Sequence, residues 1–194
     1  HRLIRRQRQM CIRDRIYTEE TNRVILQQLL PEAIVSTYTA YEEEALASLL
    51  KWADVVCIGC GLGKSKVSEQ ILEYVLRHLE IPCVIDADGL NLLARKKELL
   101  PQEAKEIILT PHMKEMAGMI GCTVSELAER RFEKLQKFVG DYGVVCALKD
   151  ARTLVAAQGR QMFLNTAGNS AMAKAGSGDV LAGCLLYTSP SPRD

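Results

Sequence analysis

Uniformly hydrophobic runs alternate with helical stretches along most of the chain after residue 54. The runs are DVVCIG at 54–59, PCVIDA at 82–87, IILT at 107–110 and VVCALK at 144–149. Because neighbouring positions are both apolar, each run is typical of a strand that is covered on both faces. Amphipathic stretches over about 64–79 and 90–99, and another between the last two runs, predict helices. The pattern predicts an α/β fold with a doubly wound, mostly parallel sheet flanked by helices.

Local signals refine this picture. Thr123 and Glu126 have the spacing of a capping box, which predicts a helix from there to about Val139. Pro111 suits the first turn of another helix after Thr110. The segments TLVAA and MFLN are separated by the turn sequence QGR and predict a hairpin, so the sheet is expected to end antiparallel.

Both ends of the chain break the pattern. Residues 1–15 lack apolar periodicity, and residues 187–194 are rich in Ser and Pro. We therefore interpret both as non-native extensions of one domain that spans residues 16–186. An Arg-rich transit peptide is the alternative for the first segment, although it would leave the last segment unexplained.

Composition and charge exclude some classes of function. The formal net charge is +1 and the first fifteen residues carry six Arg, so the remainder is mildly acidic. Such a body lacks the clustered Lys and Arg with which nucleic-acid-binding proteins neutralise phosphates. No stretch approaches the roughly 18 apolar residues of a membrane span, and nothing resembles a secretory signal. We therefore expect a cytoplasmic protein with neither nucleic acid nor a membrane as partner.

The seven Cys residues are expected to be reduced thiols. Their number is odd, and Cys57, Cys83 and Cys146 lie inside apolar runs, where a thiol behaves as a small core residue. Cys57 and Cys60 form a C-x-x-C pair. Because no second pair has zinc-like spacing, we expect no metal or redox role for it.

Five polar or glycine-rich segments follow the predicted strands and hairpin. They are GCGLGKS at 59–65, DADGLN at 86–91, TPHMKE at 110–115, KDART at 149–153 and GNSAMAKAGSGDVLAG at 168–183. Ligands of open α/β sheets bind at the carboxyl ends of the strands. We therefore expect these segments to meet in one crevice.

The last of these segments has the features of an anion site. Gly176, Ser177 and Gly178 precede Asp179 and a predicted helix, so backbone amides at the helix start would face a phosphoryl group. Asp179 could accept a proton from a substrate hydroxyl whose oxygen then attacks phosphorus. The alternative is structural: the glycines turn the chain and Asp179 caps the helix.

The GCGLGKS loop matches neither familiar phosphate-binding motif. A P-loop requires glycine at the position of Ile58, and the third glycine of a dinucleotide fingerprint would come one residue after Gly63. What remains is a tight glycine turn that brings backbone close to a ligand, or a plain turn between strand and helix.

The other polar residues each allow a functional and a structural interpretation. Asp86 and Asp88, with Asn91, could orient magnesium and water or a ligand hydroxyl, or one Asp could cap the next helix. His112 could contact a ligand or cap and pack. Lys149 and Arg152 could bind phosphates or lie on a solvated face.

In this order the five segments resemble the NAD(P)H-hydrate dehydratase family of the ribokinase-like superfamily. Its members carry G-P-G-L-G, D-A-D-G-L-N, T-P-H-x-x-E, L-K-G-x-x-T and G-N-x-G-M-A-x-G-G-[ST]-G-D-V-L-[AT]-G. The resemblance covers about residues 16–186, while the family's N-terminal glycine-rich segment and closing C-terminal helices have no counterpart. Cys60 stands where the family has proline, and Asp150 stands where it has glycine.

The resemblance implies that ADP, or ATP, phosphorylates the 6-hydroxyl of hydrated NADH or NADPH, with Mg²⁺ as cofactor, and that phosphate is then eliminated. Asp179 would be the catalytic base. The hydrated dinucleotide would be bound by Gly61, Gly63, Asp88, Asn91 and His112. The adenine nucleotide would be bound by Lys149, Asp150, Ala151, Arg152, Thr153, Asn169, Gly176, Ser177 and Gly178.

The resemblance also bears on assembly and on rival functions. We expect a homo-oligomer, and the sequence leaves open whether an epimerase domain precedes this one in the full-length parent. A small-molecule kinase of the same superfamily is the main rival, because the same base and loop would act there but the product would keep its phosphate. An inactive nucleotide-binding fragment is the other alternative.

Overall fold

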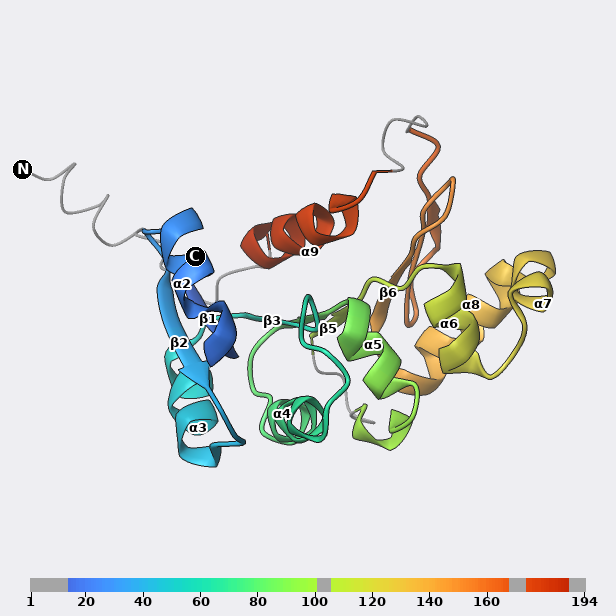
Figure 1. The fold of residues 1–194 in the computed structure, drawn as a ribbon. Helices are drawn as coiled ribbons and strands as arrows, with labels where there is room; N and C mark the ends of the chain where they lie inside the picture. Colours follow the sequence, from blue (N-terminus) through green and yellow to red (C-terminus); the bar gives the residue numbers. More distant parts are fainter. Residues whose placement is uncertain (1–13, 101–105, 168–173, 189–194) are drawn as a thin grey trace, which may run out of the picture. The chain divides into compact units, whose positions relative to one another are not determined.

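The computed structural model describes residues 14–100, 106–167 and 174–188 of the 194-residue chain. Contacts divide the chain into two compact units, His1–Glu42 and Glu43–Asp194 (Figure 1). No helix among the described residues is long and apolar enough to span a membrane.

The first unit contains a short parallel strand pair that the sequence pattern did not reveal. Strand β1 (Arg15–Glu19) pairs with β2 (Ile34–Tyr38) through a crossover formed by η1 (Glu20–Asn22) and α2 (Arg23–Leu29). The guanidinium of Arg23 lies 2.7 Å from the Glu20 carboxylate, three residues earlier. The predicted boundary between residues 15 and 16 falls within β1.

The second unit is built on a six-stranded sheet. Its order is β3 (Val56–Ile58), β4 (Cys83–Ile85), β5 (Ile107–Leu109), β6 (Val145–Leu148), β7 (Leu154–Ala157) and β8 (Phe163–Leu164). The first four strands are parallel to one another, whereas β7 pairs antiparallel with β6 and β8 pairs antiparallel with β7. The predicted α/β class, the mostly parallel sheet and the C-terminal hairpin are therefore confirmed.

The central strands form the core of this unit. All three residues of β4 are fully buried, as are Ile107 and Leu109 of β5. Burial of consecutive residues requires cover on both faces, which explains why these strands are uniformly hydrophobic in sequence. The thiols of Cys83 and Cys146 are also fully buried, and the described cysteines are all free.

Helices connect the strands and cover the sheet. They are α3 (Glu43–Trp52), α4 (Lys66–Arg77), α5 (Ala87–Leu93), η2 (Lys97–Leu99), α6 (Met113–Ile120), α7 (Val124–Glu129), α8 (Arg131–Tyr142) and α9 (Ser177–Thr188). In α4 the apolar stripe of Ile71, Leu72, Val75 and Leu76 is buried. Figure 1 shows α9 on the opposite face of the sheet from α4 and α5, and α9 contacts β3 and β4.

Three predicted helix boundaries are wrong. The helix expected over 90–99 begins already at Ala87, because Asp86 caps it, and ends at Leu93 before the short η2. The capping box of Thr123 and Glu126 is confirmed, but the expected single helix is interrupted at Arg130, whose φ of −126° and ψ of 32° are not helical. The second part, α8, continues past Val139 to Tyr142, where Gly143 in the left-handed conformation ends it.

The third boundary concerns Pro111, which lies outside the helix. Helix α6 begins at Met113, with His112 as its N-cap, so Pro111 precedes the cap instead of occupying the first turn. The cap explains the shift, because a capping box between His112 and Glu115 fixes the start of the helix. At the other end of the domain, α9 runs through Tyr187 to Thr188, past the predicted boundary at residue 186.

Candidate active site

The GCGLGKS loop and the DADGLN segment touch each other at the ends of β3 and β4. The Gly63 amide donates a hydrogen bond to Asp88 Oδ2 at 3.1 Å, and Lys64 Nζ lies 3.6 Å from the other oxygen. Gly59 has a φ of +120°, and a Cβ there would lie 1.9 Å from the carbonyl oxygen of Asp86. This position therefore has room only for glycine, and the tight turn brings the two loops together.

Asp86 is a buried carboxylate at the end of β4. Only 2% of it is exposed, and its Oδ1 accepts a hydrogen bond from the Ala87 amide at 2.8 Å as the N-cap of α5. The same oxygen lies 2.8 Å from the ammonium of Lys149. The capping interpretation is thus confirmed for Asp86, and a long-range ion pair is added to it.

Asn91 and Asp88 belong to helix α5 itself. The Asn91 side-chain amide donates to the Ala87 carbonyl at 3.1 Å, within the helix. Asp88 lies in the first turn, where its carboxylate receives the Gly63 amide. The contacts of both residues with substrate stay predictions. In the structure, Asp88 joins the start of α5 to the glycine loop, and Asn91 bonds within the helix.

Lys149 connects three of the five segments. Its amide donates to the Pro111 carbonyl at 2.7 Å, and its backbone forms an isolated parallel bridge with His112. Its side chain crosses to Asp86, 63 residues away in sequence. The TPHMKE, KDART and DADGLN segments therefore meet at one residue.

His112 is a helix cap with an exposed ring. Its Nδ1 accepts a hydrogen bond from the Glu115 amide at 3.1 Å, and the Glu115 carboxylate accepts from the His112 amide at 2.8 Å. The Nε2 atom lies 3.4 Å from the same carboxylate, and half of the side chain is exposed. The capping interpretation is confirmed, and the accessible ring edge keeps the predicted ligand contact open to test.

The start of α9 lies against the Asp86–Lys149 pair. A Cβ on Gly178 would lie 3.4 Å from Lys149 Nζ and 3.7 Å from Asp86 Oδ2. Gly176 has a φ of +87°, and the helix begins at the next residue, Ser177. The Ser177 amide donates to the Lys174 carbonyl at 3.2 Å, while the amides of Gly178 and Asp179 lie in the first turn, where helix geometry leaves them no intrahelical acceptor. The anion cradle predicted at these two amides, next to the Lys149 ammonium, stays a prediction.

Asp179 lies in the first turn of α9 and is exposed. Cys60, the residue that replaces the family's proline, lies in the glycine loop near it. The neighbouring Cys57 thiol, followed by burial and the carboxylates of Asp86 and Asp179, raises the pKa of the Cys60 thiol. The glycine loop and the start of α9 are therefore close together.

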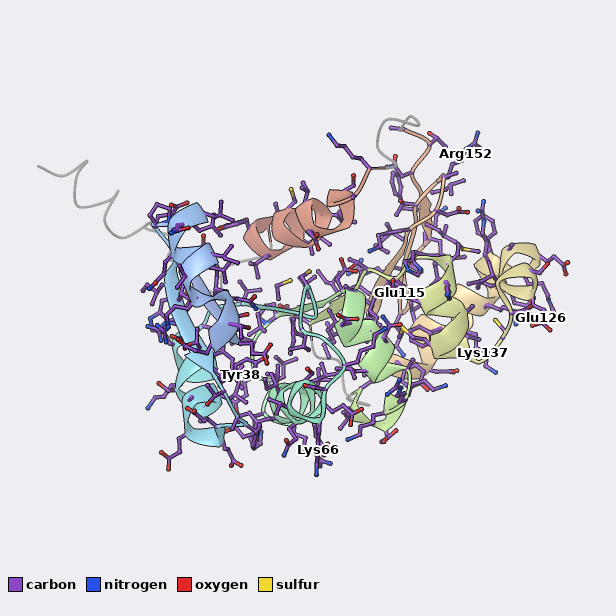
Figure 2. All side chains as sticks on the ribbon, viewed as in Figure 1. Tyr38, Lys66, Glu115, Glu126, Lys137 and Arg152 are labelled. Carbon is purple, nitrogen blue, oxygen red and sulfur yellow. The ribbon has the colours of Figure 1, made fainter. Side chains whose placement is uncertain are left out.

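The other predicted site residues that the structure describes have different neighbours. Asp150 pairs with Arg131 of α8 at 3.1 Å, so its carboxylate is directed away from Lys149. Ala151 and Arg152 are exposed, and Figure 2 shows Arg152 beside the β7–β8 hairpin. The Thr153 carbonyl accepts the Asn165 amide at 2.9 Å, and Gly61 is exposed in its turn. Asn169 lies outside the described residues.

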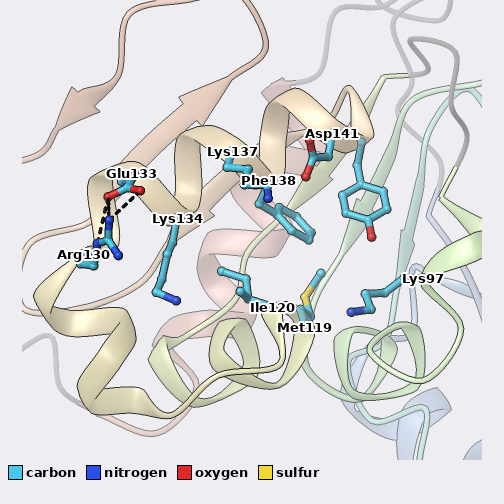
Figure 3. A pocket seen from close by; sticks show the side chains of 10 residues that line it. Lys97, Met119, Ile120, Arg130, Glu133, Lys134, Lys137, Phe138 and Asp141 are labelled. Atoms are coloured by element: carbon cyan, nitrogen blue, oxygen red, sulfur yellow. Dashed lines mark hydrogen bonds and ion pairs between the residues drawn. The ribbon is translucent and has the colours of Figure 1, made fainter.

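A hollow of about 320 Å³ lies elsewhere, between α6 and α8. Figure 3 shows Lys97, Lys134, Lys137 and Phe138 around it. None of the predicted site residues lines it. Sequence reasoning considered Asp86 as a ligand residue or a helix cap, but it missed the ion pair with Lys149. It gave Cys60 no role in the site. Both contacts join segments that are distant in sequence.

Comparisons with known proteins agree with this geometry. The family model described as NAD(P)H-hydrate dehydratase matches residues 14–190. The "ADP-dependent (S)-NAD(P)H-hydrate dehydratase" of Neisseria meningitidis is 35% identical over 82% of this chain and 55% of its own length. The "Bifunctional NAD(P)H-hydrate repair enzyme Nnr" of Escherichia coli is 38% identical over 93% of this chain and 34% of its own length.

A solved structure gives the same result in three dimensions. The "ADP/ATP-dependent NAD(P)H-hydrate dehydratase from Bacillus subtilis co-crystallized with ATP/Mg2+ and soaked with CoA" superposes with a TM-score of 0.72 at 27% identity. The match covers 94% of this chain and 65% of that one. This chain thus spans only part of the length of these relatives. Together the family match and the identities show that the chain belongs to the NAD(P)H-hydrate dehydratase family.

Proposed function

We propose that the protein converts hydrated NADH and NADPH back to NADH and NADPH, using ADP or ATP as phosphoryl donor. The observation that carries the proposal is the meeting of Gly178, Lys149 and Asp86 at the strand ends, with Asp179 on the same helix turn. A cation, free amides and a carboxylate base are the parts that phosphoryl transfer to a hydroxyl requires.

The chemistry follows from these parts. Asp179 accepts the proton of the ring hydroxyl, and the oxygen attacks the terminal phosphorus of the nucleotide. The first-turn amides of α9 and the Lys149 ammonium stabilise the charge on the migrating phosphoryl group. Phosphate is a far better leaving group than hydroxide. Breaking of the carbon–oxygen bond and loss of a proton from the neighbouring ring carbon then restore the double bond.

Magnesium fits this site as an ion carried by the nucleotide. The described residues contain no group of three His, Cys, Asp or Glu side chains that would hold a metal by themselves. Mg²⁺ is commonly bound by substrate phosphates, waters and one or two carboxylates. The partly exposed Asp88 is a candidate for such a carboxylate, and the ion would neutralise phosphate charge.

The test uses the protein at the length in which the cell makes it. Hydrated NADH is incubated with ADP or ATP and Mg²⁺, and NADH absorbance is followed over time. We expect the absorbance to return only when nucleotide is present. Absorbance that stays flat contradicts the proposal, and a phosphorylated product that keeps its phosphate would show a small-molecule kinase instead.

A further inference from the structure

Asp86 and Lys149 form the most buried ion pair that the described residues contain. The carboxylate is 2% exposed and the lysine side chain is 24% exposed, with 2.8 Å between Oδ1 and Nζ. A buried charge is unfavourable unless a partner of opposite sign compensates it. Each of these two residues therefore fixes the position of the other.

The backbone around the lysine leaves its side chain little freedom. The Lys149 amide is held by the Pro111 carbonyl at 2.7 Å, and the carboxylate of Asp86 is itself fixed as the cap of α5. The lysine is thus held at its backbone by the hydrogen bond to Pro111 and at its ammonium by the ion pair with Asp86. Such double support is what holds a catalytic group within a fraction of an ångström.

The ammonium is held directly beside the first turn of α9. A Cβ on Gly178 would lie 3.4 Å from Nζ, which is contact distance, so the ammonium and the helix start are direct neighbours. A helix start is the positive end of the helix dipole, so an ammonium alone would be unfavourable there. The negative charge of Asp86 offsets that repulsion in the absence of nucleotide. A negatively charged phosphoryl group would be attracted both by the ammonium and by the helix start.

We propose that Asp86 is a positioning residue for phosphoryl transfer, which holds the Lys149 ammonium beside Gly178 while the phosphoryl group is transferred. The proposal rests on the proposed function. It assigns no proton transfer to Asp86. Asp86 acts through Lys149, and its effect should disappear when Lys149 is absent.

The first test compares turnover and nucleotide binding in Asp86→Asn. Asparagine is as good an N-cap as aspartate, so the start of α5 is kept while the charge is lost. We expect kcat to fall by about 10- to 100-fold, with the affinity for ADP nearly unchanged. Asp141→Asn, the same chemical change on the distant helix α8, serves as the matched control and should keep wild-type kcat. A wild-type kcat in Asp86→Asn overturns the proposal.

A double-mutant cycle with Lys149→Met separates positioning from general stability. We expect Lys149→Met and the double variant Asp86→Asn/Lys149→Met to have the same kcat, because Asp86 then has nothing to position. This comparison does not require the single Asp86 variant to be stable, since the double variant leaves no buried charge unpaired. A kcat of the double variant that is clearly below that of Lys149→Met contradicts the proposal.

A binding measurement distinguishes failure of this proposal from failure of the proposed function. Calorimetry with AMP, with and without aluminium fluoride as a mimic of the migrating phosphoryl group, needs no turnover. We expect Asp86→Asn to weaken binding in the presence of aluminium fluoride about tenfold more than binding of AMP alone. Equal weakening of both overturns the positioning role. If Asp86→Asn has the expected effect on binding but the wild-type protein does not repair hydrated NADH, only the proposed function is rejected.

Discussion

The strand-end cluster of Gly63, Asp86, Asp88, Lys149 and Gly178 differs sharply from the layer formed by α6, α7 and α8. In the layer, the contacts that cap and pair the helix starts join residues three apart, such as Arg130 with Glu133 at 2.8 Å and Thr123 with Glu126, although Arg131 also reaches Asp150. In the cluster, contacts join residues 25 and 63 apart. Local contacts build the scaffold, while distant contacts build the site.

The two regions also use charge differently. Lys137 beside the hollow between α6 and α8 is exposed, so water screens its charge (Figure 3). Lys149 is largely covered and lies 2.8 Å from a buried carboxylate. The hollow lined with lysines is therefore a weaker candidate for the active site than the strand-end cluster. A buried ion pair indicates a catalytic region better than exposed lysines do.

The largest expected effect is on turnover in the cluster. Asp179→Asn removes the proton acceptor but keeps the shape of the side chain, so turnover should fall by about 100- to 10,000-fold. Nucleotide binding by calorimetry should persist, because the α9 amides and Lys149 are unchanged. Turnover near the wild-type rate would remove Asp179 from the mechanism.

The next effect is on stability at the turn that joins two loops of the site. In Gly59→Ala, the new Cβ would lie 1.9 Å from the Asp86 carbonyl oxygen, at a φ of +120°. We expect the free energy of unfolding to fall by about 2 to 4 kcal/mol, measured by urea denaturation. A loss below 1 kcal/mol, about the cost of an average substitution, would show that the loops are not packed this closely.

A matched glycine in the helical layer should respond in the opposite direction. Gly118 of α6 has no atom within 4 Å of an added Cβ, and its φ is not positive. Gly118→Ala should therefore raise the free energy of unfolding by about 0.5 to 1 kcal/mol, through helix propensity. Destabilisation of this variant would mean that the exposed face of α6 is covered in the folded protein.

The smallest effect concerns the capping box of α7. Hydrogen bonds from the Thr123 amide and hydroxyl hold the pKa of Glu126 below its ordinary value of 4.5. A lowered folded pKa means that the contribution to stability is present above pH 4.5 and is lost as the pH falls through the folded value. Glu126→Gln should flatten that part of the curve of unfolding free energy against pH. An unchanged curve would mean that the carboxylate is not bound by Thr123.

The same contrast explains what the sequence could predict. Uniform apolar runs identified β3 to β6, and the spacing of Thr123 and Glu126 identified a helix start, because those signals are local. The parallel pair β1–β2 was missed, since short half-buried strands lack a strong pattern. The helix break at Arg130 has no sequence signal that we can identify.

The candidate site was predictable in its segments and only partly in its contacts. Motifs after strand ends were expected to meet, and the ion pair and glycine contacts bring them together. The pairing of Asp86 with Lys149 and the position of Cys60 next to Asp179 depend on packing across the sheet. No spacing within one segment encodes such contacts, so they required the three-dimensional structure.

An oxygen-labelling experiment tests the central claim most directly. The hydrate is prepared in ¹⁸O-water, so that its ring hydroxyl carries the label, and it is then repaired by the protein with unlabelled ADP or ATP. If the hydroxyl attacks phosphorus at the strand-end cluster, mass spectrometry should find one ¹⁸O in each inorganic phosphate that is released with NADH. Label that appears in water, with unlabelled phosphate, would contradict phosphoryl transfer to the hydroxyl.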